Sequence, residues 1–193
     1  MEKCNAQDNS QTSLNRKGGI AEAAFLSGFY KVVCFGKDGK EKWRDTIKNT
    51  VTTLGKNLAL NTLLAGSAYS VTGPYMGLIG AVDYTDVPVA ADTMASHATW
   101  KEGGGTNAPT YTGDRKTVTF DAAADGAKAA DAAQAFAITG TGTAKGCFLV
   151  LGTGAVATKD NTSGVLYSAG LFTGGDKAVG DGDTLNVTYT ASL

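Results

Sequence analysis

The sequence predicts a mainly β fold, an antiparallel β-sandwich or jelly roll with one amphipathic helix and an extended N-terminal arm. From Phe29 onward the chain consists of short runs rich in β-forming residues, several of which alternate polar and apolar side chains. Glycine-rich turns separate these runs, and a series of such strands favours a sandwich or a jelly roll. One stretch, at about 47–65, has the periodicity of a helix instead.

The N-terminal residues 1–28 contain few large apolar side chains and read as an arm outside the body at 29–193. Two adjacent cations, Arg16 and Lys17, lie in it. Chain termini are usually ordered only when something ties them down, so we expect neighbouring subunits to hold this arm. Residues 1–60 carry ten Lys and Arg against six Asp and Glu, whereas 61–193 carry seven against twelve. A basic arm on an acidic body suits docking between subunits, and chance variation along a solvated surface is the alternative.

The body is expected to open with a hairpin and the helix. The run at 29–35 is followed by a turn at 36–40 and by a polar run around Trp43. In the helix, Ile47, Val51, Leu54 and Leu58 recur at helical spacing, and three further leucines broaden the apolar face: Leu60, Leu63 and Leu64. Asp45 or Thr46 is expected to cap its start, and Gly66 is placed to end it.

The rest of the chain is expected to be strands and turns. The predicted strands lie at 74–80, 115–122, 134–140, 146–152, 164–172 and 183–193. The last of them alternates most plainly, with Leu185, Val187 and Tyr189 on one face. The Ala-rich stretch 121–137 favours a loop over a short helix, because Gly126 interrupts it. Residues 81–114 read as a long excursion, and loops of that length are usually functional or ordered by a partner.

The composition excludes several classes of protein. The chain has 193 residues, of which 42% are hydrophobic and 18% charged, too apolar for a disordered chain. It contains no long apolar run, so we expect no membrane-spanning segment, and its polar start predicts no export. A net charge of -1 argues against a nucleic-acid-binding surface over the whole domain. We expect one soluble domain with neither a membrane nor a nucleic acid as partner.

Glycine and aspartate patterns do not predict a cofactor or a metal. Glycines at 140, 142 and 146 have the spacing G-x-G-x-x-x-G and precede a strand, so a hairpin turn is favoured over a nucleotide site. Asp176, Asp181 and Asp183 fit neither an EF-hand nor a nonapeptide calcium repeat, which favours a solvated turn.

The reactive side chains do not predict an enzyme either. The single histidine, His97, has no marked nucleophile beside it in sequence, and we expect it to have a structural or interface role. Two carboxylates paired in space would be invisible in one sequence, so that alternative stays open. The three cysteines, Cys4, Cys34 and Cys147, are far apart, and we expect free thiols with the last two buried.

Several stretches together resemble the capsid cement or decoration proteins of tailed bacteriophages. They cover roughly half of the chain and lie at 49–80, 90–102, 141–152, 163–172 and 180–193. The resemblance implies a jelly-roll-like body on the outside of an icosahedral shell, commonly a trimer, that bridges neighbouring major capsid protein subunits. Related small β proteins also occur in phage tails and fibres.

We therefore expect a structural virion protein, made in the host cytoplasm and located on the capsid exterior, with no catalytic activity and no cofactor. The major capsid protein and further copies of the chain, as a trimer, are the expected partners. The arm and the excursion are expected to form the interfaces. Aromatic and Met side chains are enriched in interface cores, so the candidate contacts are Tyr84, Met94, Trp100 and Tyr111, each of which could equally be intramolecular core.

Two rival functions stay open. A tail or fibre module could bind a receptor glycan, because exposed aromatic side chains on a β-sandwich can stack on sugars. A hydrolase would require a deep pocket holding two carboxylates, or His97 beside a nucleophile.

Overall fold

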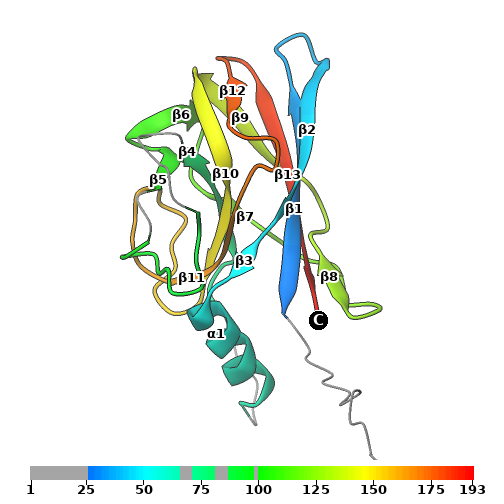
Figure 1. Ribbon diagram of the computed structural model, residues 1–193, viewed down its shortest axis with the longest axis vertical. Helices are drawn as coiled ribbons and strands as arrows, with labels where there is room; N and C mark the ends of the chain where they lie inside the picture. The colour runs from blue at the N-terminus through cyan, green and yellow to red at the C-terminus, as the bar shows by residue number, and fades with distance from the viewer. Residues whose placement is uncertain (1–25, 66–70, 81–86, 98–99) are drawn as a thin grey trace, which may run out of the picture.

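The computed structural model describes residues 26–65, 71–80, 87–97 and 100–193. Helix α1 (Thr53–Leu63) is accompanied by the strands β1 (Ser27–Phe35), β2 (Glu41–Lys48), β3 (Thr50–Val51), β4 (Tyr75–Gly80), β5 (Lys101–Gly104), β6 (Asn107–Tyr111), β7 (Lys116–Thr117), β8 (Ala127–Ala129), β9 (Gln134–Gly140), β10 (Gly142–Leu151), β11 (Val165–Leu171), β12 (Lys177–Val179) and β13 (Thr184–Ser192). The predicted mainly β fold with a helix is confirmed (Figure 1). Among the described residues, no helix is long and apolar enough to cross a membrane.

The strands form one continuous path of pairings that nearly closes on itself. Its order is β2-β1-β13-β9-β6-β5-β4-β10-β11-β3, and β7, β8 and β12 attach beside it. The two ends of the path are joined by the chain itself, since only Asn49 separates β2 from β3. Every pairing between these strands is antiparallel except that of β5 with β6. The result is a barrel-like sandwich with α1 projecting at one end (Figure 1).

The main core fills the inside of this sandwich. Tyr30 and Val32 of β1 face inward, and Val187 and Tyr189 pair opposite them on β13. All four are at most 1% exposed, so the predicted inward face of the last strand is confirmed. Alternation with period two thus turns one side of each strand into core, as it does in half-buried antiparallel sheets.

The sheet of β4, β10 and β11 is buried on its outer face as well. Ile79, Phe148 and Val150 form a second cluster there. Met94 and Trp100, which precede β5, pack over this cluster. These strands are therefore covered on both faces, which explains their nearly continuous apolar sequences.

The helix begins later than predicted. Ile47 lies in β2 and Val51 in β3, where Val51 pairs with Ser168. The helix is capped by Thr52, whose Oγ1 accepts a hydrogen bond from the amide of Gly55 at 2.9 Å, and not by Asp45 or Thr46. The helical spacing was misleading because strand pairing and core burial of β-branched residues outweigh periodicity over so short a stretch. Gly66 lies outside the described residues.

Three predictions after the helix are wrong: a hairpin turn, a long loop and a strand. Glycines at 140 and 142 flank the one-residue link between β9 and β10, but these strands are not hairpin partners, because β9 pairs with β13 and β6 while β10 pairs with β4, β11 and β12. The glycines allow close packing instead: a Cβ at Gly142 would lie 2.8 Å from the Cβ of Ala108.

The excursion 81–114 contains two strands, β5 and β6. The predicted strand at 115–122 is reduced to β7 and a bridge at Phe120.

Two further boundaries are settled. The stretch 121–137 contains β8 and the start of β9 and no helix, with Asp125 and Gly126 at positive φ in the turn. The body begins at β1, two residues earlier than predicted, and the arm before Leu26 lies outside the described residues.

Candidate functional site

Helix α1 is attached to the body along one narrow side. Gly55 and Leu58 are its buried residues. A Cβ at Gly55 would lie only 2.5 Å from the carbonyl oxygen of Tyr167 on β11, so the helix backbone rests directly on that strand. Just before the helix, the amide of Thr52 donates to the same carbonyl at 3.0 Å, and the amide of Thr53 donates to that of Ala90 at 2.7 Å. The body therefore holds the N-terminal half of the helix.

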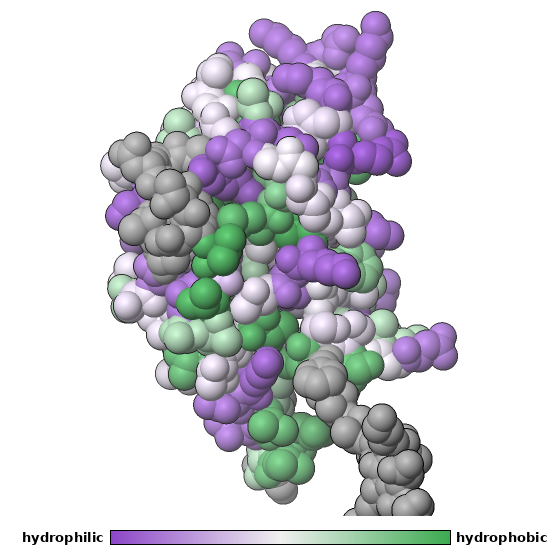
Figure 2. Space-filling model, in the orientation of Figure 1, coloured by the Kyte–Doolittle hydropathy of each residue, from purple (hydrophilic) through white to green (hydrophobic). Residues whose placement is uncertain are grey.

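The other side of the helix is apolar and exposed. Leu60, Leu63 and Leu64 are 54%, 77% and 76% exposed. Their i, i+3, i+4 spacing places them in one row, called here the leucine stripe. At about 3.6 residues per turn, this row lies roughly opposite Gly55 and Leu58. Figure 2 shows it as apolar surface at the projecting end of the molecule.

The stripe is also almost free of charge. The only charged residue of α1 is Lys56, which is exposed and lies one turn before Leu60 on the same side of the helix. A helix with apolar residues on opposite sides is normally enclosed by protein. Here the body encloses one side, so the stripe has the character of a contact surface.

The same end of the molecule carries further apolar surface. A cavity of about 320 Å³ is lined by Leu26, Tyr167, Ala191 and Leu193, with the β8 turn closing it. Leu193 is 75% exposed. Figure 1 shows α1, β8 and the C-terminus together at this end, called here the α1 end.

The opposite end is charged. The turn and strand residues 36–44 of the β1–β2 hairpin carry four cations and two carboxylates. Several are tied down: Lys42 Nζ lies 2.5 Å from Asp183 Oδ2, and Arg44 pairs with Glu41. Figure 2 shows this region, called here the hairpin end, as strongly hydrophilic.

Asp183 binds the hairpin end to the body through its ion pair with Lys42. Its side chain is 6% exposed, and it accepts hydrogen bonds from Lys42 and from the amide of Gly180. Burial on its own raises the pKa of the Asp183 carboxyl, but these two hydrogen bonds and the Lys42 charge outweigh it and leave the pKa below its ordinary value. The residue predicted to lie in a solvated turn is thus a buried structural carboxylate.

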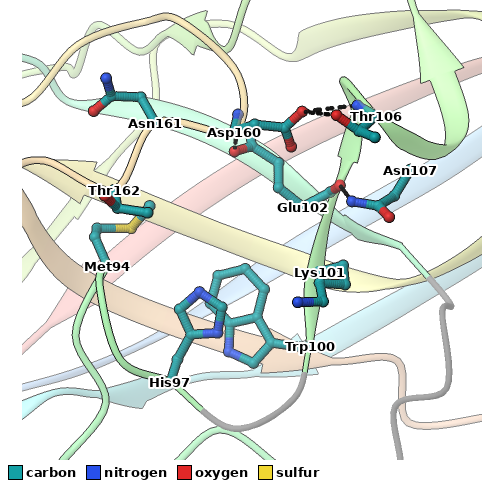
Figure 3. A pocket seen from close by; sticks show the side chains of 10 residues that line it. All are labelled: Met94, His97, Trp100, Lys101, Glu102, Thr106, Asn107, Asp160, Asn161 and Thr162. Atoms are coloured by element: carbon teal, nitrogen blue, oxygen red, sulfur yellow. Dashed lines mark hydrogen bonds between the residues drawn. The ribbon is translucent and has the colours of Figure 1, made fainter.

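A polar cavity of about 260 Å³ lies on the flank of the body (Figure 3). His97, Trp100 and Met94 form one side of it. The polar lining residues come from β5, the turn after it, the start of β6 and the loop before β11, and they are Lys101, Glu102, Thr106, Asn107, Asp160, Asn161 and Thr162. The cavity thus combines an aromatic and thioether wall with amide, hydroxyl and carboxylate groups.

A buried ion pair supports the polar side of this cavity. Arg115 donates to both oxygens of Glu102, at 2.9 and 2.7 Å, and also to the carbonyls of Val156 and Asn161. The Asp160 amide donates to the same carboxylate at 2.8 Å. Burial raises the pKa of Glu102, and these hydrogen bonds oppose the shift. The pair clamps β5 to the loop before β11, which is a structural role.

The sequence-predicted contact residues lie mostly in the interior. Met94, Trp100 and Tyr111 are 3%, 1% and 3% exposed. Trp100 packs against Phe148 with ring centroids 5.2 Å apart, and Tyr111 packs against Phe136 at 4.9 Å. These three residues are therefore part of the intramolecular core, which is the alternative that the sequence left open. Arg16, Lys17 and Tyr84 lie outside the described residues.

The remaining reactive groups are packing residues. His97 stacks on Trp100 with centroids 3.8 Å apart and ring planes within 16°. Cys34 and Cys147 are free and buried, as predicted. Burial raises the pKa of the Cys34 thiol to about 11, and that of Cys147 also lies above its ordinary value. In the part of the chain that the structure describes, no three His, Cys, Asp or Glu side chains gather so as to hold a metal ion.

The molecule therefore presents two contrasting ends and a polar cavity between them. No family model, curated protein or solved structure matches the chain. Sequence reasoning did not identify the leucine stripe as a surface, because it assigned all the leucines of the helix to a single inward face. The signal was present: Leu54, Leu58, Leu60, Leu63 and Leu64 occupy more of the helix circumference than one buried side requires.

Proposed function

We propose that the chain is a structural virion protein that binds the outer surface of a phage capsid and stabilises it by bridging neighbouring major capsid protein subunits. The single observation that carries this proposal is the leucine stripe of Leu60, Leu63 and Leu64, a row of exposed apolar side chains on a helix that projects from the body. Such surfaces mark sites of protein–protein contact. The resemblance of the sequence to capsid cement proteins supplies the class of partner.

A bridging protein needs more than one contact surface, and this molecule offers two of different chemistry. The leucine stripe at the α1 end is apolar, with Lys56, Asp125 and Lys128 as charged residues at the same end, whereas the hairpin end carries four cations and two carboxylates at 36–44. Fully burying a leucine contributes about 1.5–3 kcal/mol, so a few such side chains support an interface. The charged end favours a partner of opposite charge and accelerates its encounter.

Stabilisation of the shell would follow from mass action. A protein that binds the assembled shell and not its separated subunits shifts the equilibrium toward the assembled state. The effect grows with the concentration of free protein above the dissociation constant. No chemical reaction is involved, so the function depends only on the two surfaces and on the rigid sandwich that separates them.

The test is a titration of purified shells that lack the protein, with occupancy measured by sedimentation and shell stability by the temperature of rupture. We expect saturable binding and a higher rupture temperature at saturation. Changing both Leu63→Ser and Leu64→Ser in the leucine stripe is expected to weaken binding roughly tenfold or more. The matched control, Val87→Ser with Val89→Ser, changes two exposed apolar side chains elsewhere on the surface. Wild-type protein that leaves the shells bare would refute the proposal.

A second candidate function is favoured by the polar cavity in Figure 3. Its polar lining and the ring of His97, which is stacked on buried Trp100, suit a single neutral sugar ring, and its volume of about 260 Å³ lies just below the usual range of ligand pockets. A tail or fibre module that binds a glycan would show saturable sugar binding by ligand-observed NMR and a position at the tail tip. Thr162→Tyr, which fills the cavity from its exposed rim, should abolish that binding.

A further inference from the structure

We propose that Asp125 and Gly126 form a site of spontaneous main-chain modification, at which the aspartate is converted to isoaspartate through a cyclic succinimide. The pair lies in the turn that leads into β8, and both residues are exposed. The proposal does not depend on the function proposed above, because it concerns the chemistry of the chain itself.

The reaction requires only these two residues and water. The amide nitrogen of Gly126 attacks the side-chain carboxyl carbon of Asp125, so a C–N bond forms. The C–O bond to the carboxyl hydroxyl breaks, and the hydroxyl leaves as water with the amide proton. Water then adds to the main-chain carbonyl carbon of the ring and breaks its bond to the Gly126 nitrogen. The chain now runs through the former side-chain carbonyl of residue 125, and the former main-chain carbonyl is a free carboxylate.

The sequence contains three Asp-Gly pairs, at 38–39, 125–126 and 181–182, and all six residues are exposed. Glycine after aspartate favours the reaction, because it has no side chain to obstruct the attack on the carboxyl carbon. Sequence and exposure therefore do not distinguish the three pairs. The difference lies in whether the attacking amide is already engaged.

Two of the three attacking amides are held by hydrogen bonds. The amide of Gly39 donates to the carbonyl of Gly36 at 2.8 Å, and that of Gly182 donates to the carbonyl of Ile138 at 2.9 Å. Each must give up its bond before it can turn toward the neighbouring carboxyl group. The Gly126 amide donates to no acceptor in the part of the chain that the structure describes. The attacking atom is thus available at 125–126 alone.

The aspartate of this pair is also the least restrained. Asp38 Oδ1 accepts a hydrogen bond from the amide of Lys40 at 3.0 Å, and its Oδ2 lies 3.8 Å from Lys40 Nζ. The Asp125 carboxyl has no hydrogen bond or ion pair with any described residue. Of the three aspartates, only Asp125 has a positive φ, at 50°, a conformation that is unfavourable for a residue with a Cβ. Less energy is therefore needed to move it out of the turn.

The turn is weakly attached to the rest of the molecule. It is closed by two hydrogen bonds between Ala124 and Ala127, both of 2.9 Å. The strand that follows, β8, has three residues and joins the sheet beside its main path, through β13. Short elements at the margin of a fold open locally at low cost. Such opening lets the amide and the carboxyl group rotate into the position for attack.

The modification is expected to loosen the C-terminus. Isoaspartate adds one methylene carbon to the main chain, and a two-residue turn of defined geometry cannot take up an extra atom without a change of shape. The Gly126 carbonyl accepts a hydrogen bond from the amide of Leu193 at 3.0 Å. Both this bond and the closing bond from the Ala127 amide should therefore be lost in the modified chain.

The experiment compares the three pairs within the full-length wild-type protein. One sample is aged in buffer in the folded state and a second is aged unfolded in denaturant, and isoaspartate is located by peptide mapping with electron-transfer mass spectrometry. In the folded sample we expect residue 125 to be modified at least about tenfold faster than 38 or 181, which is the factor that one hydrogen bond supplies. In denaturant the three rates should become similar. A folded protein in which residue 125 is modified no faster than the other two, or not at all, would overturn the proposal.

A variant and a second measurement test the consequence. Asp125→Glu should form no cyclic intermediate at this position, because a glutamate would have to close a slower six-membered ring, whereas the matched control Asp38→Glu should keep the wild-type rate at 125. Hydrogen exchange of the aged wild type should be faster at the amides of Leu193 and Ala127 than in fresh protein. Aged Asp125→Glu should retain the slow exchange of its own fresh sample. Unchanged exchange in a chain that carries isoaspartate would contradict the link to the C-terminus.

Discussion

The α1 end and the hairpin end of this molecule differ in the chemical character of their exposed surface. At the α1 end, the last turn of the helix presents apolar surface, with Leu63 and Leu64 about three-quarters exposed. At the hairpin end, the surface is charged, and buried Asp183 holds Lys42 in place. Apolar contacts are weakened little by salt, whereas contacts between exposed charges are screened within roughly 10 Å at 0.1 M salt. Contacts made by the two ends would therefore respond differently to salt.

The same contrast exists within α1 itself, between its inward and outward leucines. Leu58 is 9% exposed and would lie 3.0 Å from a Cβ at Gly152, so it is packed against the body. Leu64 is 76% exposed. Leu58 therefore contributes to the stability of the fold, whereas Leu64 contributes exposed surface. Substitutions at the two positions should have different effects on stability.

The largest expected effect is at Leu58. Leu58→Ala should lower the free energy of unfolding by about 2–4 kcal/mol, because it removes packed methyl groups and leaves a cavity. Leu64→Ala, measured at a concentration where the protein is a single chain, should change it by less than about 0.5 kcal/mol. Denaturant unfolding followed by circular dichroism checks both. Equal losses at the two positions would contradict the division of the helix into two sides.

The next effect is at Gly55. Alanine is the better helix former by about 1 kcal/mol, but a Cβ here would lie 2.5 Å from the carbonyl oxygen of Tyr167. We expect Gly55→Ala to lower the free energy of unfolding by roughly 1–3 kcal/mol, because the helix must move off β11. Asn57→Ala on the exposed side is the control and should leave stability unchanged or slightly higher. A stabilised Gly55→Ala variant would show that α1 does not rest on that strand.

At the hairpin end, Asp183 should make stability depend on pH. The folded pKa of Asp183 is below its unfolded value, so its ionised form stabilises the fold above about pH 4. This stability should be lost as the pH falls through the folded pKa. Asp183→Asn should therefore cost about 1–2 kcal/mol at pH 7, and the cost should shrink as the pH falls below the unfolded pKa of about 4. Asp38→Asn, on the exposed turn, serves as the control, and an equal pH slope in both variants would contradict this role.

The smallest effect is expected at the exposed Arg44–Glu41 pair. Arg44 is 72% exposed in its side chain, and surface ion pairs usually add little to stability. Arg44→Ala should leave the melting temperature unchanged in scanning calorimetry, while its effect on shell binding should be visible at low salt and disappear at high salt. A clear drop in melting temperature would mean that the hairpin end is a structural element and not a free surface.

Much of the fold could be predicted because its signal is local. Leu185, Val187 and Tyr189 alternate with polar residues, and that alternation alone identifies a strand with one buried face. The start of the helix could not be found in this way. Ile47 and Val51 have helical spacing, yet they belong to strands because Ile47 pairs with Tyr30 across the β1–β2 hairpin and Val51 pairs with Ser168 of β11, which is remote in sequence.

The candidate site was harder to predict for a related reason. Residue type does not say whether a side chain faces a partner or the chain's own interior, so Trp100 and Tyr111 could not be distinguished from surface contacts. The clamp of Glu102 and Arg115 depends on a turn of the chain between β5 and β7 that no spacing rule reveals. The leucine stripe depends on how much of α1 the body covers, which only the packed structure determines.

The most direct test of the account is the position of the protein in intact virus particles, obtained by labelling the chain and imaging the particles by cryo-electron microscopy. The proposed function predicts density on the outside of the capsid, over contacts between shell subunits. Density at the tail tip, or no density on the particle, would contradict it.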